Sequence, residues 1–207
     1  MFITFEGPEG AGKTTAIAGI AQRLRDRGEQ VTVTREPGSG ELGVKIREIL
    51  LHGSNMPPET ELFLFLADRS HHVSSLILPA LDRNEVVLCD RYADSTYVYQ
   101  ALVRGLNPEF VRAANAFATG ALLPEKTFLL DVPSEIGLAR LKSKDRLDSE
   151  PETFHQKVRQ GFLTLAAEDP SRWQVVDATM APEEIVVVFM DWYDNHRSGQ
   201  GAFEFSS

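Results

Sequence analysis

The chain has almost no cysteine and no long uninterrupted run of apolar residues. One cysteine, Cys89, stands among 207 residues, so no disulfide can form within the chain. It follows the apolar residues Val86, Val87 and Leu88, and we expect it to be a small buried core residue. No stretch of about 18 apolar residues occurs, which argues against a transmembrane helix. Since residues 1–5 also lack a charged leader or cleavage site, we expect a cytoplasmic protein without a membrane partner.

Basic residues are also fewer than acidic ones. Lysines and arginines number 21 against 30 aspartates and glutamates, a formal net charge of −9. Such a surface does not attract a nucleic-acid backbone, so we expect no nucleic-acid partner. The neighbouring residues His71 and His72 point about 100° apart on a helix and cannot bind one metal ion as a pair. We therefore expect no zinc site.

The order of apolar segments predicts an α/β fold. Short β-rich segments alternate with longer segments of helical periodicity, which is typical of a parallel sheet with helices on both faces. The strand candidates are residues 2–5, 30–34, 86–89, 127–131 and 173–176. The helix candidates are residues 12–27, 41–51, 58–83, 108–121, 134–142, 152–168 and 182–196. Whether 58–83 is one helix or two stays open at this point.

The length favours one domain, which we place at residues 1–197. Within it, the charged segment at about 140–150 suits a mobile, solvated lid. The last residues, 198–207, contain glycine and serine without periodicity, and we expect a flexible tail there.

A phosphate-binding loop is the clearest motif. Gly7-Pro8-Glu9-Gly10-Ala11-Gly12-Lys13-Thr14 matches GxxxxGK[ST] and lies between a predicted strand and a predicted helix, which is the context the motif requires. Glycines let backbone N–H groups face phosphate oxygens, and the lysine reaches the β- and γ-phosphates. The predicted ATP site comprises Gly7, Pro8, Glu9, Gly10, Ala11, Gly12, Lys13, Thr14 and Thr15, with Thr14 as a ligand of Mg²⁺.

The loop alone leaves the reaction open. A GTPase switch would carry DxxG and NKxD motifs, and neither occurs in this sequence. A small-molecule kinase instead needs a second cradle for the phosphate of its acceptor. Arg35 and Arg91 follow two predicted strands, and Arg47 lies in the next predicted helix. Because guanidinium groups bind phosphate oxygens with paired N–H donors, these positions favour a kinase.

Four segments together resemble the thymidylate kinase family over roughly residues 1–197. They are the phosphate loop, Thr34-Arg35-Glu36-Pro37-Gly38 with the later Ile46-Arg47-Glu48-Ile49-Leu50-Leu51, the run from Phe63 to His72, and Asp90-Arg91-Tyr92 with Ser95, Tyr99 and Gln100. The resemblance implies a P-loop NTPase fold and transfer of the γ-phosphoryl of ATP to dTMP, which yields dTDP and ADP for dTTP synthesis. It also implies Mg²⁺ as cofactor and a homodimer. Another nucleoside monophosphate kinase, or a weakly catalytic nucleotide-binding regulator on the same fold, stays open as an alternative.

The resemblance assigns roles on the acceptor side. Phe65 would stack on thymine, and Arg69, one helical turn later, would donate to a base carbonyl; the alternative for Phe65 is the buried stripe of an amphipathic helix. Glu9 would meet the 3′-hydroxyl of the sugar. The predicted substrate-binding residues are Glu9, Arg35, Glu36, Arg47, Phe65, Arg69, Arg91, Ser95, Tyr99 and Gln100.

Catalysis of this kind needs positive charge around the γ-phosphoryl rather than a strong base, because the attacking oxygen is already anionic. Asp90, at a predicted strand end, would hold Mg²⁺ or its waters. Since Gly10 is not basic, the bacterial-type branch of the family implies a further cation from the lid. We expect Arg146 in that role, with Lys144 and Arg140 as alternatives. The predicted catalytic residues are Lys13, Arg91, Arg146 and Asp90.

Overall fold

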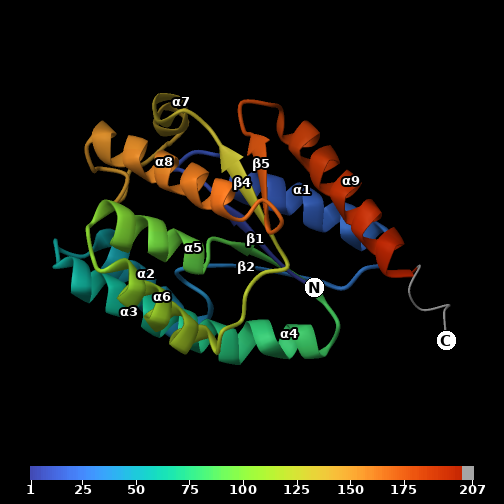
Figure 1. Ribbon diagram of the computed structural model, residues 1–207, viewed down its shortest axis with the longest axis horizontal. Helices are drawn as coiled ribbons and strands as arrows, with labels where there is room; N and C mark the ends of the chain where they lie inside the picture. The colour runs from blue at the N-terminus through green and yellow to red at the C-terminus, as the bar shows by residue number, and fades with distance from the viewer. Residues whose placement is uncertain (202–207) are drawn as a thin grey trace.

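The computed structural model describes residues 1–201, and the side chains of residues 1–197. Five parallel strands form one sheet (Figure 1), in the order β2-β3-β1-β4-β5. The strands are β1 (Phe2–Glu6), β2 (Val31–Arg35), β3 (Val86–Asp90), β4 (Lys126–Asp131) and β5 (Trp173–Asp177). Each lies within two residues of its predicted position, and the five-stranded parallel sheet is confirmed.

Side chains of the central strands alternate between two apolar layers. Ile3 and Phe5 of β1 pack against α1 (Lys13–Asp26) and α9 (Pro182–Gly201) on one face. Phe2 packs on the opposite face, in a cluster that includes Cys89. A strand that is buried on both faces favours apolar residues at most positions, which explains the nearly continuous apolar runs of the sequence. The buried, free thiol of Cys89 confirms the expectation for that residue.

Helices cover both faces of the sheet, so the fold is a three-layer sandwich. Helices α1 and α9 lie side by side, blue and red in Figure 1. The opposite side carries α2 (Gly40–His52), α3 (Pro58–His72), α4 (Leu78–Asp82), α5 (Ala93–Thr96), α6 (Pro108–Thr119) and α8 (Glu152–Glu168), with the π-helical segments η1 (Val73–Ile77) and η2 (Tyr97–Val103). Short helix α7 (Ser134–Ala139) follows β4.

The segment 58–83 is neither one regular helix nor two separate ones. Helix α3 passes into π-helical η1 at Val73, where the N–H of Leu78 bonds the carbonyl of Val73, five residues earlier. Pro79 follows at once in α4. A proline ring has no N–H and clashes with the backbone carbonyl one turn before it. The wider π-helical turn at this point relieves that clash.

Two further expectations need adjustment. The helix predicted at 134–142 ends early, since α7 stops at Ala139. Of the tail expected at 198–207, residues 198–201 belong to α9 and residues 202–207 lie outside the described part of the chain. Within residues 1–201, no helix combines the length and apolar character that crossing a membrane requires.

Candidate active site

Loops that follow the strands meet in one cavity, because parallel strands end at the same edge of the sheet. We call it the deep cavity. It is lined by all ten residues predicted for the acceptor side, namely Glu9, Arg35, Glu36, Arg47, Phe65, Arg69, Arg91, Ser95, Tyr99 and Gln100. A second hollow, the loop cavity, is lined by Gly12, Thr15, Arg140 and Met180 among others. Both cavities share Lys13 and Thr14, so the phosphate loop lies between them.

Glycine is required inside the phosphate loop by a close backbone contact with α7. Gly10 has φ 68°, a left-handed conformation that favours glycine. A Cβ at this position would lie 1.9 Å from the carbonyl oxygen of Gly137, and a Cβ at Gly137 would lie 2.2 Å from the carbonyl oxygen of Glu9. Helix α7, which leads into the lid segment, therefore rests directly on the loop.

Lys13 is folded back onto its own loop. Its Nζ donates to the carbonyl oxygens of Gly7 at 3.1 Å and Pro8 at 3.0 Å. The residue is 7% exposed, and burial, followed by the charge of Arg91, lowers its pKa to about 8. A buried ammonium group with two weak carbonyl partners gains much from an anionic phosphate.

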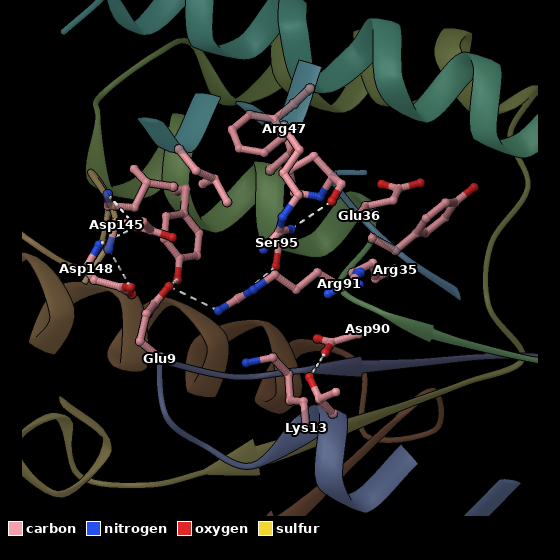
Figure 2. Close-up of a pocket in the computed structure, with 18 of the residues that line it drawn as sticks. Glu9, Lys13, Arg35, Glu36, Arg47, Asp90, Arg91, Ser95, Asp145 and Asp148 are labelled. Carbon is pink, nitrogen blue, oxygen red and sulfur yellow. Dashed lines mark hydrogen bonds and ion pairs between the residues drawn. The ribbon is translucent and has the colours of Figure 1, made fainter. Parts of the chain in front are cut away.

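The two predicted metal ligands lie in direct contact. The hydroxyl of Thr14 donates to Oδ2 of Asp90 at 2.7 Å, joining the start of α1 to the end of β3 (Figure 2). No group of three or more histidine, cysteine or acidic side chains suited to a metal occurs among the described residues. One hydroxyl and one carboxylate instead fit an ion that takes its remaining ligands from phosphate and water, as Mg²⁺ does.

Arg91 occupies the centre of the deep cavity (Figure 2). It follows β3 with φ 67°, a left-handed conformation that is rare for a side chain of this size and recurs at functional sites. Its guanidinium donates to Glu9 Oε1 at 3.1 Å and to Ser95 Oγ at 3.2 Å, and lies 5.4 Å from the centroid of the Tyr99 ring. The guanidinium is thus held by three neighbours, from the phosphate loop, α5 and η2.

Glu9 is held as an anion although it is buried. Its carboxylate accepts from Arg91 and from the hydroxyl of Tyr99, the latter at 2.5 Å. Nδ1 of His155 lies 3.8 Å from the other oxygen, an ion-pair distance too long for a hydrogen bond. Burial opposes ionisation, but Arg91, then His155, Lys13 and Tyr99 outweigh it and lower the pKa of Glu9 to about 2.

Arg69 lines the deep cavity and is hydrogen-bonded to protein groups, and its donation to a base stays a prediction. Its side chain is 1% exposed. Its N–H groups donate to Glu36 Oε2 at 2.8 Å, Thr96 Oγ1 at 2.9 Å, Asn115 Oδ1 at 2.7 Å and the carbonyl oxygen of Tyr92 at 3.1 Å. Glu36 also pairs with Nδ1 of His72 at 2.9 Å. Glu36 and Arg69 therefore brace the cavity wall. The four hydrogen bonds use four of the five N–H groups of Arg69, and the fifth is on Nη2, which lies 2.7 Å from Glu36 Oε2.

The remaining predicted residues are placed as follows. Arg47 is partly buried and donates to the carbonyl oxygen of Pro37 at 2.8 Å; burial, then the charge of Arg35, lowers its pKa. Phe65 is half-buried: it lines the deep cavity and also packs against the apolar cluster beside it. Gln100 is fully buried beside the cavity, with Nε2 donating to Glu61 at 2.7 Å.

The chain is similar to known proteins over most of its length. The family model described as thymidylate kinase matches residues 5–187. A thymidylate kinase of Thermomicrobium roseum is 53% identical over 188 residues, which cover 89% of this chain and 90% of the relative. One of Nitratidesulfovibrio vulgaris is 50% identical over 197 residues, 89% of this chain and 92% of the relative. The chain belongs to the thymidylate kinase family. The crystal structure of thymidylate kinase from Ehrlichia chaffeensis superimposes with a TM-score of 0.78 at 29% identity, covering 93% of this chain and 98% of that one.

In this thymidylate kinase family member, the lid arginine expected to act in catalysis lies away from both cavities. Arg146 does not line either cavity; it donates to Glu61 at 2.5 Å and to the carbonyl oxygen of Leu50 at 2.8 Å. Arg140 instead lines the loop cavity and lies 3.4 Å from the carbonyl oxygen of Gly10. The carboxylate of Glu61 in α3 binds Arg146 and holds it away from the phosphate loop. The sequence of the lid does not reveal this partner.

Three buried residues that contact the cavity lining were not predicted. Glu6 accepts from the backbone N–H of Tyr92 at 2.8 Å and the hydroxyl of Ser95 at 2.5 Å. Burial, and then the charge of Asp94, raises its pKa to about 7. Glu61 and His155 are each 1% exposed. A charged residue within an apolar strand was the available signal for Glu6; the other two lie on helices with no local signal.

Proposed function

We propose that the protein transfers the γ-phosphoryl of ATP to dTMP and so forms dTDP and ADP. One observation carries the proposal: the ten residues expected to contact dTMP line a single cavity, and Gly10, Lys13 and Thr14 of the phosphate loop line it as well. The loop cavity on the other side of Lys13 and Thr14 offers the place for ATP. Relatives that are half identical over about nine-tenths of this chain support the same reaction.

Phosphoryl transfer here rests on alignment and charge. An anionic phosphate oxygen of dTMP attacks the γ-phosphorus, and the bond to the β-phosphate breaks, with ADP as the leaving group. Arg91 faces the phosphate loop from the deep cavity and would hold the attacking phosphate, together with Arg47 and Arg35. Lys13 would exchange its two carbonyl partners for β- and γ-phosphate oxygens.

The kinase family implies a divalent metal cofactor, and we assign Mg²⁺. Thr14 and Asp90 would hold it or its waters at the edge of the phosphate loop. Bound there, the ion would neutralise charge on the phosphates. Arg140 takes the place that the sequence assigns to Arg146 as the lid cation, because it borders the loop cavity. Glu9, fixed by Arg91 and Tyr99, would accept from the 3′-hydroxyl.

The rest of the proposal follows the expectations from the sequence. We propose residues 1–197 as a single catalytic domain, a homodimer as the assembly and the cytoplasm as the location. Phe65 would stack on the thymine ring, and Tyr99 would pack along the deoxyribose.

An acceptor panel tests the proposal. Purified protein receives Mg-ATP and one of dTMP, dUMP, UMP, CMP or AMP, and ADP formation is followed. We expect the highest kcat/KM with dTMP. A protein that prefers another monophosphate is a different nucleoside monophosphate kinase, whereas one that binds ATP without acceptor-dependent ADP release is a regulator; either result refutes the proposal.

A further inference from the structure

Glu61 of α3 lies at the centre of a buried network that joins the lid to the deep cavity. Oε2 accepts from Nη2 of Arg146 at 2.5 Å, and Oε1 accepts from Nε2 of Gln100 at 2.7 Å. Nε of Arg104 lies 3.4 Å from the same carboxylate, and the Arg104 guanidinium pairs with Glu150 at 2.6 Å. Segments that are far apart in the chain thus meet at one carboxylate.

The carboxylate of Glu61 fixes which way the Gln100 amide points. An ionised carboxylate accepts hydrogen bonds and does not donate them, so Gln100 presents its NH₂ group to Glu61. Its carbonyl oxygen Oε1 is buried and has no partner among the described residues, although Gln100 lines the deep cavity. A buried acceptor without a donor is costly. A ligand that brings an N–H group to Gln100 is therefore favoured over one that brings another acceptor.

Arg146 ties this arrangement to the lid. Its backbone N–H donates to the carbonyl oxygen of Leu51 at 3.0 Å and its Nε to that of Leu50 at 2.8 Å. The next residue, Leu147, is buried in an apolar cluster with both leucines. This half of the lid is docked on the end of α2 rather than solvated, and Arg146 reaches Glu61 from there.

We propose that Glu61 and Arg146 are positioning residues for selection of the base. Anchored by the docked lid, Glu61 holds Gln100 so that its carbonyl accepts the N3–H of thymine and disfavours cytosine, whose N3 is an acceptor. This proposal rests on dTMP as the acceptor, as argued above. Neither residue touches the reacting phosphates; both act through Gln100.

Binding of dTMP and dCMP to the full chain, measured by titration calorimetry, tests the proposal. In Glu61→Gln the new amide both donates and accepts, so Gln100 can turn over. We expect the preference for dTMP over dCMP to fall about tenfold or more, the magnitude of one lost hydrogen bond to a buried partner. Arg146→Gln should shift the preference in the same direction, and Arg146→Lys should recover part of it because the positive charge is kept. Lys142→Gln, an exposed charge in the same lid, is the matched control and should change nothing.

Steady-state kinetics separates positioning from direct catalysis. We expect KM for dTMP to rise in Glu61→Gln and Arg146→Gln while KM for ATP stays constant. Equal binding of dTMP and dCMP by the wild type, or an unchanged preference in both variants, overturns the proposal. So does a fall in kcat for Arg146→Gln with the preference intact, which would place Arg146 at the phosphoryl group. If Glu61→Gln fails to fold, the base preferences of Arg146→Gln and Arg146→Lys decide the proposal. If the wild-type protein binds dTMP preferentially but transfers no phosphoryl group, only the proposed function is refuted. The binding of dTMP and dCMP by the variants then still tests the roles of Glu61 and Arg146.

Discussion

Replacement of Glu9 by glutamine tests the electrostatics of the site through stability. The pKa of Glu9 falls from an ordinary 4.5 to about 2, and each pKa unit corresponds to about 1.4 kcal/mol. The ionised carboxylate therefore contributes about 3 kcal/mol to the free energy of unfolding. For a chain of this length, that loss lowers the melting temperature by about 6–12 °C.

The pH dependence gives a second signature with a definite sign. Because the folded-state pKa of Glu9 lies below the unfolded value, its contribution is fully present above pH about 4.5 and is lost as the pH falls toward 2. The difference in the free energy of unfolding between wild type and Glu9→Gln should be constant near neutral pH and should shrink toward zero in acid. Differential scanning calorimetry of the nucleotide-free proteins at pH 7 and in acid measures it.

Glu48→Gln provides the matched control, since Glu48 is an exposed carboxylate on α2. It changes the net charge equally and should leave the melting temperature nearly unchanged. A Glu9→Gln protein that melts within about 1 °C of wild type at pH 7, or a gap that persists unchanged in acid, would refute the reasoning.

Three other predictions concern kinetics. Arg47→Ala should raise KM for dTMP by about tenfold or more, the magnitude of one charge-assisted hydrogen bond, with little change in kcat; equal losses in both would remove Arg47 from the acceptor cradle. Arg140→Ala should raise KM for ATP and lower kcat while KM for dTMP stays constant, and unaltered ATP kinetics would exclude Arg140 as the lid cation. Because the pKa of Lys13 is about 8, kcat/KM for ATP should be flat below that pH and fall above it; a profile that is flat to pH about 9.5 would contradict the assignment of this pKa to ATP binding.

The sequence predicts which residues gather, because strand positions determine where the following loops lie. Arg35 ends β2 and Arg91 follows the neighbouring strand β3, and the P-loop follows β1, next to β3. Parallel strands bring these loops to one edge, so the deep cavity could be predicted without coordinates. The helical boundaries could be predicted less well, as the π-helical turn before Pro79 shows.

Side-chain partners could not be predicted, since they depend on contacts between distant segments. Arg69 pairs with Glu36, 33 residues away, and Arg146 pairs with Glu61, 85 residues away. Both arginines have the chemistry to bind phosphate or a base, and local spacing does not reveal a buried carboxylate within reach. Packing of α2, α3 and the lid therefore decides what these two arginines do.

Transfer of labelled phosphorus tests the central claim most directly. ATP labelled at the γ-phosphorus is incubated with the protein, Mg²⁺ and dTMP, and the products are separated. The site predicts that the label appears in dTDP, in an amount equal to the ADP formed, and that Lys13→Ala abolishes the transfer. Label that appears as inorganic phosphate, or that remains in ATP while dTMP is bound, would contradict the account.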